Sequence, residues 1–328
     1  MIPEDISELL KRQHYVIAGK HSAVQVCRWT KKALTGEGVC YKQKFYGIKS
    51  YGCCQMTPAV MWCPNKCLHC WRAIELTLGD KMENTDSAKE IVDKCIEAQK
   101  KLLTGFKSHK KIDMVKWEDA QEPSQFAISL SGEPLIYDKI CDLVEELRAR
   151  NKTSFIVTNG LYPEKIQEMI DKNCLPTQLY ISVNSPNKEL YDRFHRSSMK
   201  DAWEKLNKSL EIMGKIKGRT VFRINLVKDL NMNASLEKKR KQEKEPKDYP
   251  ELYSEMIKKA NPMFIEVKGF MSVGYARERL GYDKMPYHED IVDFAKKILK
   301  FLPEYKILDE HEFSRVVLLG KSEEGRKI

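Results

Sequence analysis

Residues 61–71 read MWCPNKCLHCW and place three cysteines, Cys63, Cys67 and Cys70, within eight positions. A structural zinc site usually takes four ligands and closes its coordination sphere. Three ligands leave one position of a metal centre open to a group that the protein does not supply. The spacing is too cramped for a disulfide framework, because three close cysteines cannot all pair with one another. The alternatives are a zinc site with a remote fourth ligand, or buried cysteines that act as small apolar side chains.

Length and composition bound the class of protein. The chain has 328 residues, 42% of them hydrophobic and 32% charged, which allows one large domain or two ordinary ones with a real core. No apolar run approaches the roughly 18 residues of a membrane span. The N-terminus MIPEDISELLKRQ has no apolar stretch and does not read as a signal peptide. We therefore expect a cytoplasmic protein, in which ten cysteines favour metal binding or catalysis over disulfides.

Basic residues are concentrated near the N-terminus. The formal net charge is +10, and residues 9–72 hold eleven Lys and Arg against one acid, Glu37. A concentrated basic region favours a polyanionic partner, most simply nucleic acid. The alternative is a solvated face on a basic protein.

From about residue 51 onward, short β-rich runs alternate with helical stretches. The β-rich runs are 55–60, 126–130, 154–158, 179–183, 221–227 and 264–270. The helical stretches are 86–105, 134–150, 163–173, 200–217, 249–260 and 288–302. This alternation predicts βαβ units and a parallel sheet. Six units are two short of a closed eight-fold barrel, so the predicted fold is α/β, an open partial (β/α)6 barrel with an added strand at 315–320.

The same pattern predicts how the chain is divided. Residues 1–50 are expected to be a basic N-terminal extension that begins with a helical period, and residues 51–328 to be the barrel. The stretch LEKKRKQEKEPKDYP at 236–250 is almost all charge, with two prolines, and is expected to be an exposed insertion.

The cysteine triplet follows the first predicted strand, 55–60. In parallel α/β barrels the reactive groups lie on loops at the C-terminal ends of strands. C-x3-C-x2-C in this place, with the aromatic Trp71 beside the third cysteine, resembles the radical S-adenosylmethionine superfamily. The resemblance implies that Cys63, Cys67 and Cys70 hold a 4Fe-4S cluster whose fourth iron binds the amino and carboxylate groups of S-adenosylmethionine.

Further polar motifs follow the next predicted strands. SGEP at 131–134 resembles the glycine–glutamate motif of that superfamily, with Ser131 at the position where a glycine is often seen. The resemblance implies that Ser131, Gly132 and Glu133 contact the methionine amino group. Candidates for ribose and carboxylate contacts come from TNG at 158–160 and SVN at 182–184: Thr158, Asn159, Ser182 and Asn184. Each of the four is equally plausible as a turn or helix-cap residue.

A second set of cysteines, Cys27, Cys40 and Cys53, lies upstream with twelve residues between neighbours. This arrangement is similar to that of the archaeal 4-demethylwyosine synthases, which modify transfer RNA, and YDRFHR at 191–196 also matches them. The resemblance covers nearly the whole chain and implies a second 4Fe-4S cluster on these cysteines. Cys54 remains an alternative ligand, although equal spacing favours Cys53. The remaining cysteines are expected to be structural: Cys95, Cys141 and Cys174.

The resemblance implies the synthesis of a tricyclic base. The substrate would be phenylalanine tRNA with N1-methylguanosine at position 37, and pyruvate would supply two carbons of the third ring. A 5′-deoxyadenosyl radical, made from S-adenosylmethionine, would remove hydrogen from the N1-methyl group, and the carbon radical would attack pyruvate. The enzyme is expected to be a monomer served by an unidentified flavodoxin- or ferredoxin-like electron donor.

Pyruvate is expected to be held in one of two ways. Lys42, two residues after Cys40, matches the lysine proposed in the family to form a Schiff base, and an iminium is a stronger electrophile than a ketone. Lys44 is the rival lysine, and both could simply contact phosphate. The open iron of the second cluster is the other candidate.

Contacts to RNA are expected from two places. The basic region offers Lys31 and Lys32, and the segment after the fourth strand offers Arg193 and Arg196, with His195 between them. Trp62, Trp71 and Tyr41 could stack on bases, although core packing is the commoner fate of such residues. Two other functions remain open at this point: a zinc-stabilised RNA-binding protein, and a radical enzyme that activates another protein through a glycyl radical.

Overall fold

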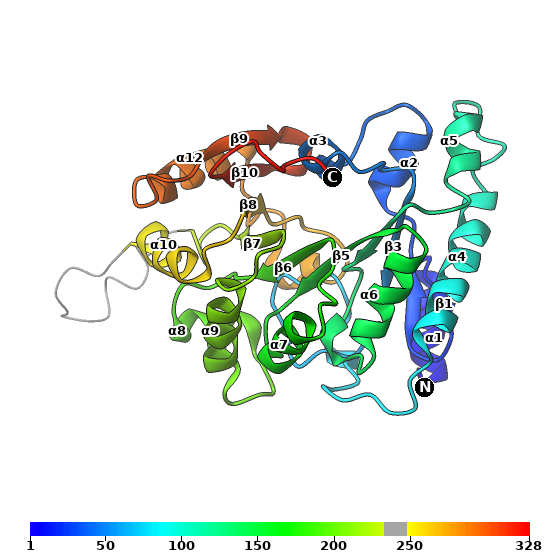
Figure 1. Ribbon diagram of the computed structural model, residues 1–328, viewed down its shortest axis with the longest axis horizontal. Coiled ribbons are helices and arrows are strands. Elements are labelled where there is room, and N and C mark those ends of the chain that lie inside the picture. Colours follow the sequence, from blue (N-terminus) through cyan, green and yellow to red (C-terminus); the bar gives the residue numbers. More distant parts are fainter. Residues whose placement is uncertain (233–247) are drawn as a thin grey trace.

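The computed structural model describes residues 1–232 and 248–328, and a ten-stranded sheet runs through them. Its order is β1-β2-β3-β4-β5-β6-β7-β8-β10-β9 (Figure 1). The six central strands are parallel: β3 (Cys53–Thr57), β4 (Gln125–Ile128), β5 (Thr153–Thr158), β6 (Gln178–Ser182), β7 (Thr220–Leu226) and β8 (Phe264–Gly269). Antiparallel strands extend both edges, so the predicted open barrel of six parallel strands is confirmed.

A helix that follows each of these strands covers the outer face of the sheet. These helices are α4 (Ala88–Thr104), α6 (Ile140–Ala149), α7 (Pro163–Asp171), α9 (Ala202–Met213), α10 (Tyr249–Ala260) and α12 (His288–Leu299). Each has one buried apolar stripe, as the sequence period predicts, and together they bury the largest apolar core against the strands. Helix α4 begins with a capping box, in which the Ser87 and Glu90 side chains each accept a backbone N–H of the other residue.

Both edges of the sheet contain more structure than the sequence predicts. One edge is the hairpin β1 (Val16–Ala18) and β2 (Ser22–Val24), and the other is β10 (Val316–Gly320) with β9 (Lys306–His311). Only β10 was expected. Strand β2 pairs with β3, so part of the N-terminal segment belongs to the barrel sheet. The division at residue 50 stays a prediction.

Several short helices were also missed. They are α2 (Arg28–Leu34), α3 (Tyr41–Tyr46), α5 (Met114–Asp119), α8 (Lys188–His195) and α11 (Ala276–Leu280). Helix α1 (Glu4–Arg12) lies where the sequence period places it. Of the predicted insertion 236–250, residues 236–247 lie outside the described residues, and Asp248 caps α10.

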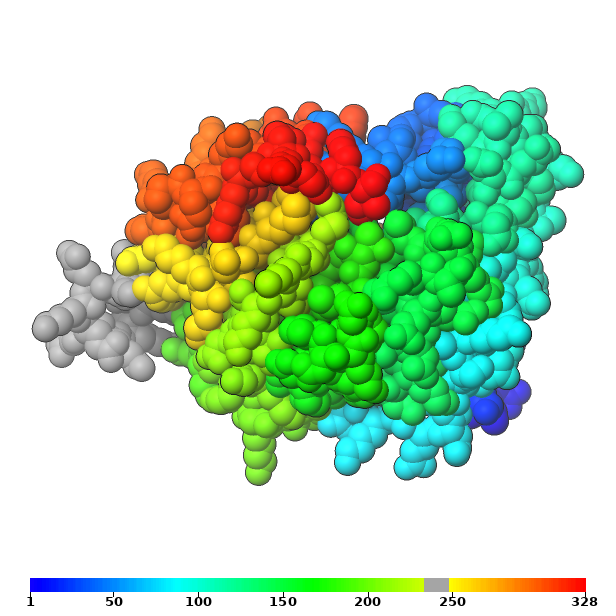
Figure 2. All heavy atoms as spheres, in the orientation of Figure 1, coloured from blue at the N-terminus to red at the C-terminus, as the bar shows by residue number. Residues whose placement is uncertain are grey.

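The inner face of the barrel has a core of its own near the N-terminal ends of the strands. Helix α3 packs there against the strands, and its buried aromatic residues are Tyr41, Phe45 and Tyr46. The strands contribute Phe155, Tyr180, Val221, Phe264 and Leu318. The last residues of the chain, red in Figure 2, cover α3, and the Ile328 N–H donates to the Tyr46 carbonyl over 2.9 Å. This end of the barrel is therefore closed.

The cysteines expected to be structural are buried. Cys141 and Cys174 form a disulfide, and Cys95 lies in α4 against the sheet. No helix in the described part of the chain is long and apolar enough to cross a membrane.

Candidate active site

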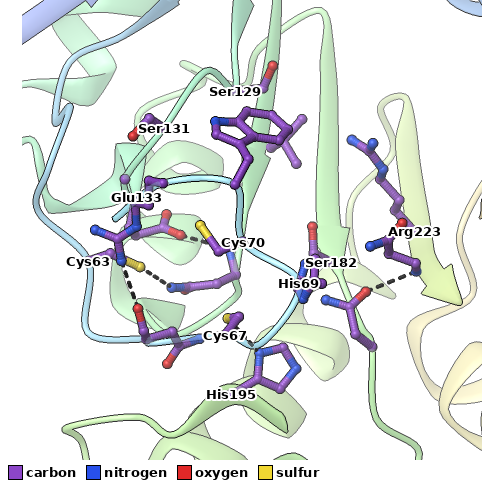
Figure 3. A pocket seen from close by; sticks show the side chains of 18 of the residues that line it. Cys63, Cys67, His69, Cys70, Ser129, Ser131, Glu133, Ser182, His195 and Arg223 are labelled. Carbon is purple, nitrogen blue, oxygen red and sulfur yellow. Dashed lines mark hydrogen bonds between the residues drawn. The ribbon is translucent and has the colours of Figure 1, made fainter. Parts of the chain in front are cut away.

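The long loop after β3 carries Cys63, Cys67 and Cys70 at the C-terminal edge of the parallel strands, as predicted. They line a cavity of about 270 Å³ together with residues from the ends of β4, β5, β6, β7 and β8. Figure 3 shows the three cysteines on the same side as Glu133, with Arg223 across the pocket. The cavity is therefore built from elements that are distant in sequence.

The donor set suits an iron–sulfur cluster better than a single ion. Among the described residues, no three His, Cys, Asp or Glu side chains lie close enough to hold one metal ion. A 4Fe-4S cluster bonds each thiolate to a different iron, so its cysteines are spread apart. Burial raises the pKa of the Cys63 thiol to about 11, so a thiolate there needs nearby positive charge.

Arg72 supplies that charge. Its guanidinium is only 4% exposed and donates to the carbonyls of Met61 and Asn65, over 3.2 and 2.7 Å. Within the described residues no carboxylate pairs with it. A buried guanidinium without a carboxylate partner is costly unless another anion lies nearby. Three thiolates on a cluster would provide that anion, so the residues present fit the group.

Two further side chains approach the cysteine sulfurs. The Asn159 amide nitrogen lies 3.8 Å from the Cys63 sulfur, and His195 Nδ1 lies 3.1 Å from the Cys67 sulfur. His195 is 3% exposed, and burial holds the pKa of its imidazole well below the usual range. Helix α8 turns this side chain inward to the cysteine loop, where it lines the cavity, and the expected contact of His195 with RNA stays a prediction.

Glu133 lies at the floor of the cavity, 1% exposed. Its carboxylate accepts hydrogen bonds from the Thr158 hydroxyl at 2.6 Å, the Asn159 N–H at 2.7 Å and the Leu135 N–H at 3.1 Å. Burial raises the pKa of Glu133 to about 7, and these three donors oppose the shift. A fixed, buried carboxylate suits a ligand ammonium group.

Gly132 brings this motif against the cysteine loop. Its φ is +72°, and a Cβ there would lie 1.7 Å from the Ala59 carbonyl oxygen. The neighbouring Ser131 hydroxyl donates to the Val60 carbonyl over 2.5 Å, and the Glu133 N–H donates to the Trp62 carbonyl over 2.8 Å. The SGEP motif and the cysteine loop therefore form one unit.

The four polar residues predicted to bind the cofactor all line the cavity, but they differ in how free they are. Thr158 is occupied, since its hydroxyl donates to Glu133 and accepts from the Gly160 N–H. Asn184 is also occupied, because its side-chain oxygen accepts the Asn225 N–H over 3.0 Å. Thr158 and Asn184 thus position their neighbours. Asn159 has partners as well, since its side-chain oxygen accepts the Leu161 N–H over 3.0 Å and its amide nitrogen lies 3.8 Å from the Cys63 sulfur. Ser182 lines the cavity from the end of β6.

The second cysteine set gathers at the other end of the barrel interior. Cys27 and Cys40 immediately precede α2 and α3, and neither thiol caps its helix by a hydrogen bond. Burial raises the pKa of the Cys40 and Cys53 thiols, and in each case the next cause is the charge of Cys27. The ionisation of each of these thiols is therefore coupled to the charge of the others. Cys54 points to the opposite face of β3, where its sulfur lies 4.0 Å from the Cys95 carbonyl oxygen.

Lys42 and Lys44 have different environments although they share α3. Lys42 is 8% exposed, and its Nζ lies 4.7 Å from the Tyr180 ring centre and 5.1 Å from that of Phe155. Burial lowers the pKa of Lys42, and Glu266 opposes that shift. Lys44 has a side chain that is 47% exposed and forms an ion pair with Asp309 over 2.9 Å.

The residues expected to bind RNA do not lie together. Lys31 and Lys32 are on α2, whereas Arg193 is on α8 and Arg196 caps its C-terminal end, on the opposite side of the molecule (Figure 1). Among the three aromatic residues considered, Trp62 and Tyr41 are buried in cores. Trp71 is 40% exposed and lines the cavity, so it alone could meet a base there.

Sequence reasoning missed several charged residues of the cavity. Arg72, Arg223 and Lys268 all line it. Arg279 of α11 donates to the carbonyls of Leu68, Cys70 and Arg72 and so fastens the cysteine loop. A charge inside an otherwise apolar strand was the available signal for Arg223 in VFRINLV and Lys268 in FIEVKGF. Arg279 had no such signal, because it lies about 200 residues from the loop that it contacts.

Comparisons with known proteins agree with the geometry. The radical SAM superfamily matches residues 58–237, and the family described as wyosine base formation matches residues 259–321. The S-adenosyl-L-methionine-dependent tRNA 4-demethylwyosine synthase of Pyrococcus abyssi is 46% identical over 98% of this chain and 90% of its own length.

Solved structures match over the full length as well. One, described as TYW1 with a lysine–pyruvate adduct bound, has a TM-score of 0.84 and 32% identity, and covers 100% of this chain and 98% of its own. Another, of archaeal TYW1, has a TM-score of 0.78 and 29% identity and covers 100% of both chains. The zinc and glycyl-radical alternatives are thereby set aside, and the chain belongs to the radical S-adenosylmethionine family of tRNA 4-demethylwyosine synthases.

Proposed function

We propose that this chain condenses N1-methylguanosine-37 of phenylalanine tRNA with pyruvate to give 4-demethylwyosine. The observation that supports this most is the arrangement of one barrel interior. Cys63, Cys67 and Cys70 line the cavity at the C-terminal ends of the strands, and Lys42 lies over the inward-facing rings of Tyr180 and Phe155. A reaction that joins two substrates needs both held in one cavity.

The first site would bind a 4Fe-4S cluster on Cys63, Cys67 and Cys70, and S-adenosylmethionine beside it. When bound, the cluster supplies the electron that cleaves S-adenosylmethionine. Glu133 would accept the methionine ammonium, while Ser131 and Gly132 hold that motif against the cysteine loop. Thr158 would keep the Glu133 carboxylate in place, and Asn159 and Ser182 would face the ribose and carboxylate.

Cys27, Cys40 and Cys53 would hold a second 4Fe-4S cluster. The charges of these three thiols act on one another, and Cys54, the neighbouring thiol among the described residues, faces Cys95 in the outer core instead. An open position then remains on that cluster as well.

Lys42 would bind pyruvate as an imine. Its amine nitrogen attacks the C2 ketone carbon, the C–N bond forms, and the ketone oxygen leaves as water. The interior position favours this, because the amine is shielded by Phe155 and Tyr180 and has no carboxylate within ion-pair distance among the described residues. The lysine–pyruvate adduct of the similar TYW1 structure supports the same chemistry. Lys44, held by Asp309 at the surface, is a poor candidate.

RNA would approach the cysteine-loop edge of the barrel. Trp71 is exposed there, and Arg196 lies next to the same loop, since its Nε donates to the Lys66 carbonyl over 3.1 Å. Arg193 is on the same helix. Lys31 and Lys32 on α2 would contact a more distant part of the tRNA. We expect a monomer that receives electrons from a flavodoxin- or ferredoxin-like protein.

The test is incubation of the anaerobically reconstituted protein with methylated phenylalanine tRNA, S-adenosylmethionine, a reductant and carbon-labelled pyruvate. Nucleoside mass spectrometry should find a tricyclic base with label from pyruvate, and the protein should contain roughly eight irons. About four irons per protein would contradict the second cluster. If S-adenosylmethionine were cleaved but the tRNA stayed unmodified, the proposed reaction would be wrong.

A further inference from the structure

We propose that Arg223 and Lys268 form a carboxylate-binding subsite that holds the carboxylate of pyruvate while its ketone reacts at Lys42. The subsite rests on the proposed function and adds to it how the enzyme selects an α-keto acid over a neutral carbonyl compound. The inference depends on two cations on adjacent strands, the cavity that both line, and a guanidinium for which the described residues show no hydrogen bond to a carboxylate.

Both residues lie on the wall of the cavity formed by β6, β7 and β8. In these parallel strands Ser182 is in register with Arg223, Arg223 with Glu266, and Asn225 with Lys268. Side chains two residues apart on a strand share a face, so Arg223 and Lys268 are diagonal neighbours on the inner face of the barrel. Both line the cavity.

Arg223 has unused hydrogen-bonding capacity. Among the described residues it forms one ion pair, with Glu266, whose carboxylate oxygen lies 3.9 Å from Nε and so is too far for a hydrogen bond. That carboxylate is already occupied, since it accepts the hydroxyls of Tyr41 and Tyr46 over 3.2 and 2.8 Å. The planar end of the guanidinium is therefore left for a ligand, and it matches the two oxygens of a carboxylate.

Lys268 is partly satisfied and has a donor to spare. Its Nζ donates to the Ser314 carbonyl over 2.9 Å and the Gly269 carbonyl over 3.4 Å, and an ammonium has three donors. Burial and the charge of Arg223 lower the pKa of Lys268 to about 7. Two neighbouring, partly buried cations lie near the single carboxylate of Glu266, so an anionic ligand between them would offset the excess positive charge.

The position of this pair relative to Lys42 favours pyruvate as the source of the carboxylate. Lys42 lies over Tyr180, which is in register with Val221, two residues before Arg223. Two residues along a parallel strand advance about 6.6 Å, a distance that a three-carbon acid and the end of an arginine side chain span together. The Lys42 amine and the Arg223 guanidinium can thus meet the two ends of one small molecule.

The opposite wall carries the complementary charge. Glu133 lies across the pocket from Arg223 (Figure 3). Its carboxylate, which accepts hydrogen bonds from Thr158 and Asn159, suits the ammonium of S-adenosylmethionine. S-adenosylmethionine also has a carboxylate, which Arg223 and Lys268 could bind in place of that of pyruvate. The experiment must therefore distinguish these two ligands.

The test is borohydride trapping of the Lys42 adduct on the reconstituted enzyme over a range of pyruvate concentrations, with methyl pyruvate as the neutral analogue. Arg223→Gln and Lys268→Gln should each raise the half-saturating pyruvate concentration roughly ten- to hundredfold, the usual effect of losing a charged hydrogen bond. Trapping of methyl pyruvate should change by less than about twofold, because the ester has no charge to hold. Arg223→Lys should recover part of the pyruvate preference.

Lys228→Gln is the matched control, because it also removes one positive charge close to the end of β7. Lys228 forms an ion pair with Asp290 and does not line the cavity. It should leave both half-saturating concentrations unchanged. S-adenosylmethionine affinity, measured without pyruvate by equilibrium dialysis, should also be unchanged in Arg223→Gln and Lys268→Gln.

Three results would overturn the subsite: equal losses for pyruvate and its ester, no loss for either, or weaker S-adenosylmethionine binding with unchanged pyruvate trapping. The last would assign the pair to the cofactor carboxylate. Failure of the proposed function looks different, because wild-type enzyme would then form neither an adduct nor a tricyclic base. If wild type forms the base without a trapped adduct, the pyruvate KM for base formation tests the subsite alone and must rise in the Arg223→Gln variant.

Discussion

Lys42 Nζ lies 4.7 Å from the centre of the Tyr180 ring, inside the barrel and one layer of side chains below the cavity that holds the cysteine triplet. Above Tyr180 on the same strand is Ser182, which lines that cavity. A substrate carbon bound to Lys42 would therefore point toward the cavity along the barrel axis. This is the direction from which the methyl group of the RNA base must arrive.

Replacement of Lys42 separates pyruvate binding from the other steps. Lys42→Arg keeps the positive charge but cannot form an imine. We expect normal tRNA affinity, continued formation of 5′-deoxyadenosine and loss of the tricyclic base, with no borohydride adduct on the peptide that spans residues 40–44. Lys44→Arg, at the surface beside Asp309, is the control and should remain active. If the Lys42→Arg variant were fully active, pyruvate would have to be bound by the open iron of the second cluster instead of by Lys42.

The two cysteine sets should fail in different ways. Alanine at Cys63, Cys67 or Cys70 should abolish cleavage of S-adenosylmethionine. Alanine at any member of the second set (Cys27, Cys40 and Cys53) should leave some uncoupled cleavage to 5′-deoxyadenosine but no base. The control is Cys54→Ala, which removes a thiol on the other face of the strand and should retain roughly eight irons per chain. Normal base formation by the second group of variants would contradict the second cluster.

Binding of S-adenosylmethionine should depend on pH through Glu133. Its pKa is raised to about 7 because it is buried, so the carboxylate that receives the ammonium forms as the pH rises through 7. Affinity should therefore weaken by about tenfold for each pH unit below 7 and level off above it. Glu133→Gln should bind weakly at every pH. Equilibrium dialysis at pH 6 and pH 8 provides the measurement, and a wild-type affinity independent of pH would exclude this role.

The basic helix α2 should contribute to RNA affinity without touching the reacting base. Reversing Lys31 and Lys32 to Glu should weaken tRNA binding and reduce the slope of log affinity against log salt by somewhat under one unit for each lost phosphate contact. The control is Lys172→Glu. Lys172 is an exposed lysine at the C-terminal end of α7 that forms an ion pair with Glu168. An unchanged slope after the α2 substitutions would place the RNA on the α8 side alone.

Gly132 should be among the least replaceable positions of the fold. Gly132→Ala forces a left-handed backbone on an L-residue and drives its Cβ to 1.7 Å from the Ala59 carbonyl oxygen, so the loop must move. We expect a loss of roughly 2 kcal/mol or more in the free energy of unfolding. Gly105→Ala is the matched control, because its φ is −66° and no atom lies within 4 Å of the added Cβ. Thermal unfolding of the two variants gives the comparison.

Much of the barrel could be predicted from sequence because its signals are local. The predicted stretch 249–260 coincides with α10, and 154–158 and 179–183 overlap β5 and β6 within a residue at each end. These elements have a regular apolar period over several residues. The missed strands β1, β2 and β9 are short or exposed, so their sequences have no regular apolar period. They form because neighbouring strands at the sheet edges supply their hydrogen-bond partners.

The sequence by itself determined the two cysteine sets, the glycine–glutamate motif and the alternation that puts such motifs at strand ends, since each depends on spacing along the chain. Tertiary structure decided the rest. It set Cys53 on the inner face of β3 and Cys54 on the outer face, because neighbouring residues of a strand point in opposite directions and only the curvature of the sheet defines an inside. It likewise turned Lys42 inward and Lys44 outward on one helix, and it brought Arg223 and Lys268 to one wall, because side chains on different strands become neighbours only when the strands pair.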